Sequence, residues 1–390
     1  MSELVSKLIN MITFNKPFLS GKELEYIREA VSNGKISGDG SFTKRSQDFF
    51  TSRYGFQKCL LTTSCTDALE MAALLIDIKP GDEVIVPSFT FVSTANAFVL
   101  RGAKIIFADC MKEHPNIDAE KIEELITPKT KAIIPVHYSG IACEMDKIIS
   151  IAKKYNLFVI EDAAQAIDSY YKGKAIGSIG NLATFSFHET KNIISGEGGM
   201  LVINDMSFTN RSEIIREKGT NRSSFYRGEV DKYNWVDIGS SFLPSEIIAA
   251  FLFAQLEKID EIQKKRKEIW QSYYELLRPI ELKGLINLPF IPDYATNNAH
   301  MFYILCNDEK TRNNLLTYLK SKDVMAVFHY LPLHLSPYYA PKHDGRALSN
   351  SEHFSNTIIR LPFFYELKKA EILYIAESIF SFFGLTLGHL

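Results

Sequence analysis

The sequence predicts an α/β protein: a mainly parallel seven-stranded sheet with one antiparallel strand, helices on both faces, and a smaller C-terminal α/β domain. Short apolar, β-rich runs alternate with helical patterns between residues 58 and 205. These runs are apolar on both faces, as in parallel sheets buried between helices. The length of 390 residues exceeds what one compact core usually holds, so a second domain is expected.

The first part of the chain predicts helices that precede the sheet. Residues 1–10 indicate a loose or helical lead-in, and residues 21–33 have helical spacing that ends at Asn33-Gly34, a favourable C-cap. The glycine-rich stretch "SGDGSFTK" then predicts a loop, followed by a helix through about Tyr54.

The alternation of strand-like apolar runs with segments of helical periodicity predicts the sheet. The expected strands are 58–62, 83–87, 104–109, 131–137, 157–162, 183–187 and 199–205, and the expected helices between them are 66–77, 90–101, 118–126 and 145–155. Only residues 188–198 separate the last two strands. A parallel crossover normally needs a dozen or more residues, so the last strand should run antiparallel to the others.

The second half of the chain predicts a long helical region and the smaller domain. Residues 206–218 indicate a helix, and residues 219–241 show no clear period, which is typical of a functional or interfacial segment. Ser245 is the expected N-cap of the long helical region. We expect a large domain over residues 1–245, and the long helix with the small domain over residues 246–390.

Composition excludes several function classes. The 44 basic and 46 acidic residues give a net charge of −2, which favours neither nucleic-acid nor membrane binding. Five scattered cysteines without a C-x-x-C motif indicate free thiols in a reducing compartment. The N-terminal residues lack the apolar core of a signal peptide, and the sequence has no run of about 18 apolar residues that would suit a membrane helix. A cytoplasmic protein is therefore expected.

Three stretches place reactive side chains where strands end. "VIED" ends in Glu161 and Asp162, "TTSCTD" brings Ser64 and Thr66 to the start of a helix, and "FSFHETK" carries Ser186 and Lys191. Each has an ordinary interpretation: a carboxylate that caps a turn, hydroxyls that cap a helix, and an exposed lysine.

The shared edge of the sheet favours a joint function for these residues. The carboxyl ends of parallel strands form the usual ligand edge of an α/β sheet, and helix N-termini bind phosphate. A lysine, a carboxylate and a phosphate site together suit pyridoxal 5′-phosphate (PLP), which needs an amine for its aldehyde and an acid for its ring nitrogen.

Ordered motifs between about residues 12 and 340 support this interpretation. The chain resembles the sugar-nucleotide aminotransferases of the DegT/StrS type, which are fold-type I PLP enzymes, in "SGDGSFT", "SCTDALEMAALL", "GDEVIVPSFTFVSTANAFVLRGAKIIFAD", "PVHYSG", "VIEDAAQA", "SFHETKN", "GEGGM" and "YLPLH". "REKGTNRS", "RGEVDKY" and "DIGSSF" are similar to the branch of the family that forms dTDP-4-amino-4,6-dideoxygalactose for enterobacterial common antigen.

The resemblance implies a role for each matching residue. Lys191 would form the Schiff base and move the proton, and Asp162 would pair with the pyridine nitrogen. The other implied cofactor contacts are Gln165 to the ring hydroxyl, Phe91 stacked on the ring or simply in the core, and Cys65, Thr66 and Ser186 around the phosphate.

One motif departs from the family pattern. Many relatives carry G-x-N-x-R, whose Asn reaches the phosphate from the partner subunit, whereas this chain has Ser241 at the Asn position and Leu243 at the Arg position. The cross-subunit phosphate contact through Ser241 is therefore in doubt. The "GSS" form is similar to the 4-aminogalactose-forming branch.

Substrate contacts are expected from weaker signals. Arg222, Arg227 and Lys232 would bind a nucleotide diphosphate or belong to a solvated loop. His329 and His334 have a spacing that metal ligands could use, but neither acids nor cysteines cluster nearby. The resemblance instead implies that His329 contacts the sugar. His188 either lines the site or packs beside it.

The resemblance implies a homodimer that transfers an amino group from glutamate to the 4-keto carbon of dTDP-4-keto-6-deoxyglucose. The alternatives are another nucleotide-linked keto-sugar, 3-keto or UDP-linked, and a PLP-dependent sugar dehydratase. The dehydratases of this family have histidine in place of the lysine, so Lys191 disfavours that reaction. A non-catalytic regulatory protein would lack the cofactor residues or carry a nucleic-acid module, and the sequence shows neither.

Overall fold

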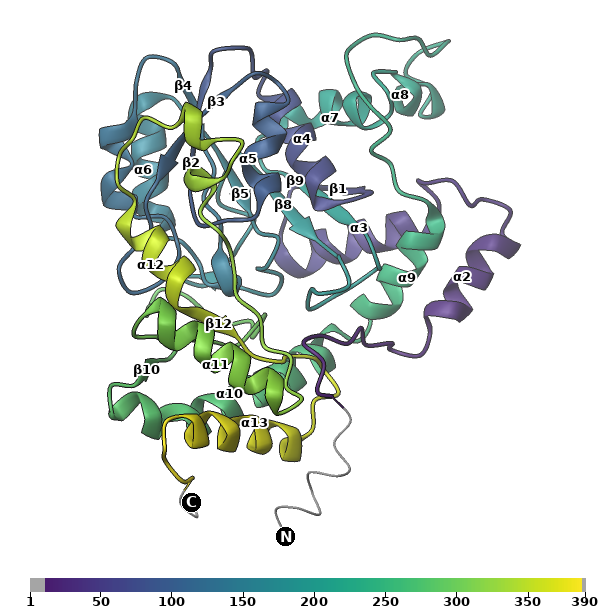
Figure 1. Ribbon diagram of the computed structural model, residues 1–390. Coiled ribbons are helices and arrows are strands. Elements are labelled where there is room, and N and C mark those ends of the chain that lie inside the picture. Colours follow the sequence, from purple (N-terminus) through teal and green to yellow (C-terminus); the bar gives the residue numbers. More distant parts are fainter. Residues whose placement is uncertain (1–10, 388–390) are drawn as a thin grey trace.

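A mixed sheet forms the centre of the larger part of the molecule (Figure 1). The computed structural model describes residues 11–387, so the predicted lead-in at residues 1–10 lies outside the described residues. The strand order is β1-β9-β8-β5-β4-β2-β3. The strands are β1 Lys58–Thr62, β2 Glu83–Pro87, β3 Lys104–Ala108, β4 Thr130–Ile133, β5 Phe158–Asp162, β8 Leu182–Ser186 and β9 Gly199–Ile203.

The direction of β9 confirms the expectation from the short link before it. β9 pairs antiparallel with both β1 and β8, whereas β8, β5, β4, β2 and β3 pair in parallel. β1 and β8 therefore share one direction on either side of β9. The predicted strand 131–137 is shorter than expected, because Pro135 has no N–H to donate and only the bridge between Val136 and Asp162 continues the pairing.

Helices cover both faces of this sheet, as predicted. Successive strand residues alternate between two cores: Ile85 packs on one face, and Val84 and Val86 pack on the other. The helices packed on the sheet are α3 Ser41–Tyr54, α4 Cys65–Leu75, α5 Val92–Val99, α6 Met145–Tyr155 and α7 Thr209–Arg216. The first described helix, α2 Glu23–Ser32, packs on a later helix instead.

The predicted helix over residues 118–126 is wrong. The segment forms two 3₁₀ turns, η1 Ala119–Lys121 and η2 Glu123–Leu125. Asp118 caps the first turn by accepting a hydrogen bond from the N–H of Glu120. Pro128 then disfavours helical backbone at the residue before it, so little length is left for an α-helix.

The long helical region consists of two helices, α9 Glu246–Leu256 and α10 Ile259–Leu282. Ser245 caps α9, as predicted, by accepting from the N–H of Ile248. The buried carboxylate of Glu246 accepts from the N–H groups of Gly40, Phe42 and Thr43, so α9 caps the N-terminus of α3. Residues 219–241 contain one short helix, α8 Arg222–Tyr226, which the lack of periodicity did not predict.

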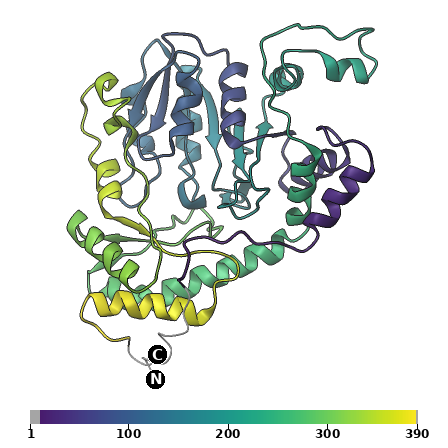
Figure 2. The same ribbon diagram turned by 45° about the vertical axis from the view of Figure 1, so that its right-hand side comes forward.

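The remainder of the chain forms the smaller C-terminal part below the large sheet (Figure 2). An antiparallel sheet of order β10-β11-β12 shares a core with the C-terminal half of α10 and with α13. Its elements are β10 Ile286–Asn287, β11 Tyr303–Cys306, β12 Ile358–Arg360, α11 Glu309–Ser321, α12 Ser349–Thr357 and α13 Lys369–Phe382.

α9 packs against α2 and α3, so its contacts lie in the larger part of the molecule. The predicted domain boundary between residues 245 and 246 stays a prediction. The short elements that complete the described chain are η3 Tyr138–Gly140, β6 Tyr170–Tyr171, β7 Lys174–Ala175, η4 Met206–Phe208, η5 Leu333–Leu335 and η6 Ala340–Lys342. Within residues 11–387, no helix combines the length and apolar character needed to cross a membrane.

Candidate active site

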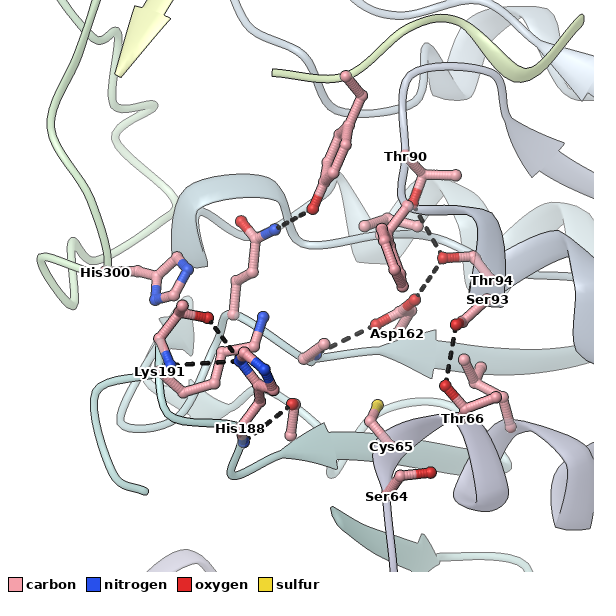
Figure 3. A pocket seen from close by; sticks show the side chains of 18 of the residues that line it. Ser64, Cys65, Thr66, Thr90, Ser93, Thr94, Asp162, His188, Lys191 and His300 are labelled. Carbon is pink, nitrogen blue, oxygen red and sulfur yellow. Dashed lines mark hydrogen bonds between the residues drawn. The ribbon is translucent and has the colours of Figure 1, made fainter. Parts of the chain in front are cut away.

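A cavity of about 550 Å³ lies where the parallel strands end, between the large sheet and the smaller C-terminal part. The N-termini of α4 and α5 and the ends of β5 and β8 form one wall (Figure 3). His300, His329, Tyr330 and Arg360 come from the C-terminal part. The volume suits a cofactor together with part of a substrate.

The N-terminus of α4, where the sequence predicts an anion site, lines the cavity. Ser64 is its N-cap and accepts from the N–H of Asp67 at 3.0 Å, which confirms helix capping as one role of this hydroxyl. The N–H groups of Cys65 and Thr66, in the first turn, have no intrahelical partner and remain available to a ligand. The hydroxyl of Thr66 donates to Ser93 Oγ at 2.9 Å, which joins the starts of α4 and α5.

Gly199 allows the backbone of β9 to approach this helix terminus. A Cβ atom at Gly199 would lie 2.3 Å from the carbonyl carbon and oxygen of Ser64 and 2.4 Å from the nitrogen of Cys65. Separations below 3.0 Å do not occur for real Cβ atoms, so a side chain would displace the first turn of α4. The glycine of "GEGGM" therefore sets the position of the anion site.

The adjacent carboxylates of β5 point to opposite faces of the sheet. Glu161 is buried away from the cavity and accepts from the N–H groups of Ile179 and Gly180, at 2.8 and 2.7 Å. Burial would raise the pKa of Glu161, but the hydrogen bond from His137 and those from the backbone together lower it. Glu161 thus stabilises the loop before β8, whereas Asp162 lines the cavity.

Asp162 is a nearly inaccessible carboxylate with a fixed orientation. It accepts from the hydroxyl of Thr94 at 2.7 Å and from the N–H of Ala164 at 3.1 Å. Burial raises the pKa of Asp162, and the hydrogen bonds from Thr94 and Ala164 limit the rise. A cationic group bound beside this carboxylate would stabilise its ionised form.

Lys191 lies in the loop after β8 and lines the same cavity (Figure 3). Its N–H donates to the carbonyl of His188 at 2.9 Å, which fixes the backbone of the turn. Burial lowers the pKa of the Lys191 amine to about 8, although Cys65 and Asp162 act in the opposite direction. A larger fraction of the amine is therefore neutral near pH 7 than for an exposed lysine, and a neutral amine is nucleophilic.

The remaining predicted cofactor residues also line the cavity. Gln165 accepts from the N–H of Ser139 at 2.6 Å and donates to the hydroxyl of Tyr330 at 3.2 Å. Phe91 precedes α5 and is 56% exposed, so its ring is accessible rather than part of the core. Ser186 ends β8.

Both histidines proposed as substrate contacts line the cavity. His188 lies within hydrogen-bonding distance of the Thr190 hydroxyl, at 3.0 Å. His329 is 2.9 Å from the hydroxyl of Tyr138, and burial lowers its pKa well below the ordinary value. His334 instead packs behind the cavity wall, 2.7 Å from Ser88 Oγ. The two histidines of "HYLPLH" therefore have different partners.

Four predicted ligand contacts lie outside the cavity. Ser241 forms an isolated bridge with Glu217. Arg222 contacts Glu217 and Tyr226, and Arg227 forms ion pairs with Glu213 and Glu229. Lys232 is exposed in the loop after α8. Their predicted phosphate contacts stay predictions.

Several cavity residues were not predicted from the sequence. Ser93 and Thr94 lie in a hydroxyl-rich stretch after β2 that resembles the Ser64–Thr66 stretch after β1, so a local signal was present. His300, Tyr330 and Arg360 are brought to the cavity by the packing of the C-terminal part, for which the local sequence gives no signal.

The donor set fits PLP. The free N–H groups of α4 suit its phosphate, the buried carboxylate of Asp162 suits a protonated ring nitrogen, and the amine of Lys191 suits its aldehyde. No cluster of three metal-binding side chains occurs in the part of the chain that the structure describes.

Known proteins share this architecture over most of the chain. Residues 17–380 match the DegT/DnrJ/EryC1/StrS aminotransferase family. The chain is 34% identical over 370 residues to GDP-perosamine synthase of Escherichia coli O157:H7, with 95% of this chain and 98% of that protein covered. It is 32% identical over 386 residues to the spore coat polysaccharide biosynthesis protein SpsC of Bacillus subtilis strain 168, with 96% and 98% covered. The aminotransferase TlmJ from Streptoalloteichus hindustanus superposes with a TM-score of 0.88 at 26% identity, covering 96% of this chain and 99% of that one.

Proposed function

The chain belongs to the DegT/DnrJ/EryC1/StrS aminotransferase family, a family of PLP-dependent sugar aminotransferases, and from this premise we propose its reaction. It transfers the amino group of glutamate to the 4-keto carbon of dTDP-4-keto-6-deoxy-D-glucose. The product is dTDP-4-amino-4,6-dideoxy-D-galactose. The observation that carries the proposal is the position of Lys191 beside Asp162 in one cavity, with the N-terminus of α4 in its wall.

Each residue has a distinct part in this proposal. PLP, when bound, supplies an aldehyde that receives the amino group and a ring that withdraws electrons from the reacting carbon. Asp162 would hold the ring nitrogen protonated, and Thr94 would fix the orientation of that carboxylate. The N–H groups of Cys65 and Thr66 would hold the phosphate. Lys191, with its pKa lowered to about 8, would move the proton to and from the reacting carbon.

The choice of substrate rests on narrower features. The "GSS" sequence at Gly239–Ser241 resembles the branch that forms 4-amino-4,6-dideoxygalactose. The relative GDP-perosamine synthase is named for a product on a different nucleotide, so a GDP-linked substrate is the main alternative among nucleotide bases. Lys191 disfavours the dehydratase alternative, because the dehydratases that resemble this family carry histidine at that position.

Substitution of the lysine tests the catalytic assignment. Lys191→Ala should lower turnover of glutamate and dTDP-4-keto-6-deoxyglucose by at least about a thousandfold, since it removes both the covalent attachment and the proton transfer. It should also abolish the visible absorbance that borohydride reduces in the PLP-loaded wild type. Lys174→Ala, an exposed lysine on β7, is the matched control and should behave as wild type. Full turnover by Lys191→Ala would refute the assignment.

We also propose a homodimer with shared active sites. Tyr226, Tyr233 and Trp235 are 69%, 52% and 83% exposed on the segment that follows α7, and exposed aromatic clusters favour association. Ser241, Arg222, Arg227 and Lys232 on the same segment would then contact the ligands of the partner's site. Sedimentation analysis should give twice the monomer mass, and a monomer at micromolar concentration would contradict the proposal.

The same proposal places the enzyme in the cytoplasm, in the synthesis of a glycan such as enterobacterial common antigen or lipopolysaccharide. The cytoplasmic location is supported by five free thiols, which are usual in compartments where glutathione keeps cysteines reduced. They are Cys59, Cys65, Cys110, Cys143 and Cys306. Expression in cells followed by fractionation would test the location.

A further inference from the structure

Arg360 reaches the cavity from the smaller C-terminal part. It is the last residue of β12, and its backbone is fixed by paired hydrogen bonds with Val327, at 2.8 and 3.0 Å. It lies opposite Tyr303 of β11 in the small sheet. The side chain lines the cavity together with His329 and Tyr330, so a rigid strand presents its guanidinium to the site.

The guanidinium of Arg360 has no anionic partner. Its Nε is buried and makes no hydrogen bond, and among residues 11–387 no carboxylate lies within 4.0 Å of it. The guanidinium lies over the ring of Phe14, with 4.7 Å between Cζ of Arg360 and the ring centroid. An arginine stays charged in proteins, and a charge that is removed from water without a partner is costly. Arg216, which is buried, is paired with Asp39, whereas Arg360 is half-buried and its side chain lines the cavity; we therefore look for its partner among the ligands.

Two histidines of the C-terminal part line the cavity together with Arg360 but add no charge there near pH 7. Burial, with the nearby charge of Arg360 as a further cause, lowers the pKa of His300 and of His329 well below the ordinary value, so both rings are neutral near pH 7. Arg360 and Lys191 line the same cavity, the first from the C-terminal part and the second from the loop after β8. An anion bound by Arg360 would therefore share the cavity with the reactive amine.

We propose that Arg360 binds the α-carboxylate of the amino donor. In an amino acid the carboxylate is attached to the carbon that gives up the amino group, whereas in a 4-keto sugar nucleotide the diphosphate is on C1, across the ring from the reacting carbon. The planar guanidinium matches a carboxylate through two parallel hydrogen bonds. The cofactor phosphate has its own site at the N-terminus of α4, on a different wall of the cavity. The inference rests on the proposed aminotransferase function.

The two half-reactions are measured separately to test this role. The absorbance of the PLP-loaded enzyme reports the progress of the reaction with the amino donor. Arg360→Met should lower the rate constant for glutamate at limiting concentration roughly a hundredfold, the loss typical of a charge-assisted hydrogen-bonded pair. The rate with 4-aminobutyrate, which is glutamate without its α-carboxylate, should stay unchanged. The pyridoxamine-loaded variant should aminate the keto-sugar as the wild type does, and Arg360→Lys should recover part of the glutamate rate.

Arg312→Met is the matched control, because this buried arginine of α11 also lies over an aromatic ring, that of Phe328, and is absent from the cavity lining. It should leave both half-reactions unchanged. Equal losses with glutamate and 4-aminobutyrate, or a loss confined to the keto-sugar, would overturn the role of Arg360. If the wild type failed to react with any amino acid, the proposed function itself would fail, and with it this inference.

Discussion

Asp162 and Glu161 show at the scale of single residues how a strand separates two chemically identical groups. Successive side chains of a strand point to opposite faces of the sheet. Glu161 therefore points toward backbone N–H groups and His137, which form hydrogen bonds with its carboxylate. Asp162 faces the cavity with two hydrogen bonds, so it keeps acceptor capacity for a ligand. The first carboxylate stabilises the fold, and the second is available for chemistry.

Lys191 should titrate well below an ordinary lysine. In the ligand-free protein, trace acetylation of Lys191, followed by peptide mass spectrometry, should increase as pH rises with a midpoint near 8, because burial favours the neutral amine. The sign follows from the lowered pKa: the amine is mostly protonated below pH 8 and mostly neutral above it. The urea-unfolded protein is the control and should show the ordinary midpoint near 10.5. The same midpoint in the folded protein would contradict a buried amine.

The residues of the site differ in how far the sequence could predict them. Lys191, Asp162 and Thr66 follow strands of one sheet, and strand direction alone brings them to one edge. Arg360 and His300 are more than a hundred residues away from Lys191 in the chain, and only the packing of the small sheet against the large one brings them to the cavity. No local pattern distinguishes an arginine that will lie unpaired in a cavity from one at the surface.

At the scale of elements, the contact between β9 and α4 determines the geometry of the anion site. β9 lies between β1 and β8, and its first residue is in contact with the N-terminus of α4 through Gly199. The antiparallel strand therefore does more than complete the sheet, since it places the helix terminus beside β8, which ends at Ser186 and leads into the loop of Lys191.

Gly199→Ala should weaken cofactor binding at this contact. The added methyl group would displace the backbone at Ser64 and Cys65, so PLP affinity should fall roughly tenfold to a hundredfold, while overpacking lowers stability by about 1–3 kcal/mol. Equilibrium titration with PLP measures the first effect, and urea unfolding of the ligand-free protein measures the second. Gly196→Ala, in the same loop, is an informative comparison because no atom lies within 4 Å of its added Cβ, although its φ of +80° costs some stability. Wild-type PLP affinity in Gly199→Ala would refute the role of the close approach.

Strands were easier to predict than the segments between them. Buried parallel strands are continuous apolar runs bounded by polar residues, so β2 and β5 were evident from the sequence. The apolar spacing of residues 118–126 is that of a helix, but the segment forms the 3₁₀ turns η1 and η2. The cap at Asp118 and the nearby Pro128 favour these short turns over an α-helix. Helix α8 is five residues long, too short for a period to be detected.

At the scale of the whole molecule, the cavity depends on both parts of the chain. The large sheet supplies the lysine, the acid and the anion site, and the smaller part supplies the wall with Tyr330 and Arg360. Tyr330 packs against a cluster that includes residues of β11 and β12, and it accepts a hydrogen bond from Gln165 of the larger part. A change in the packing of the two parts would therefore shift Tyr330 and Arg360 relative to Lys191 and Asp162.

The seven-stranded sheet and its one antiparallel strand were predicted because they follow from local hydrophobic pattern and link length. The order of the strands and the docking of the C-terminal part were not, because they depend on contacts between residues far apart in the chain, such as the hydrogen bond between Gln165 and Tyr330. Substrate identity lies further still from the sequence pattern, since it depends on side chains that only the folded chain brings to the cavity.

Product analysis tests the central claim most directly. The purified protein, incubated with PLP, glutamate and dTDP-4-keto-6-deoxyglucose, should release 2-oxoglutarate and a nucleotide sugar whose NMR spectrum shows an amine on C4 in the galacto configuration. An unchanged keto-sugar, an amine on C3, or a product that has lost a hydroxyl group without gaining nitrogen would contradict the account.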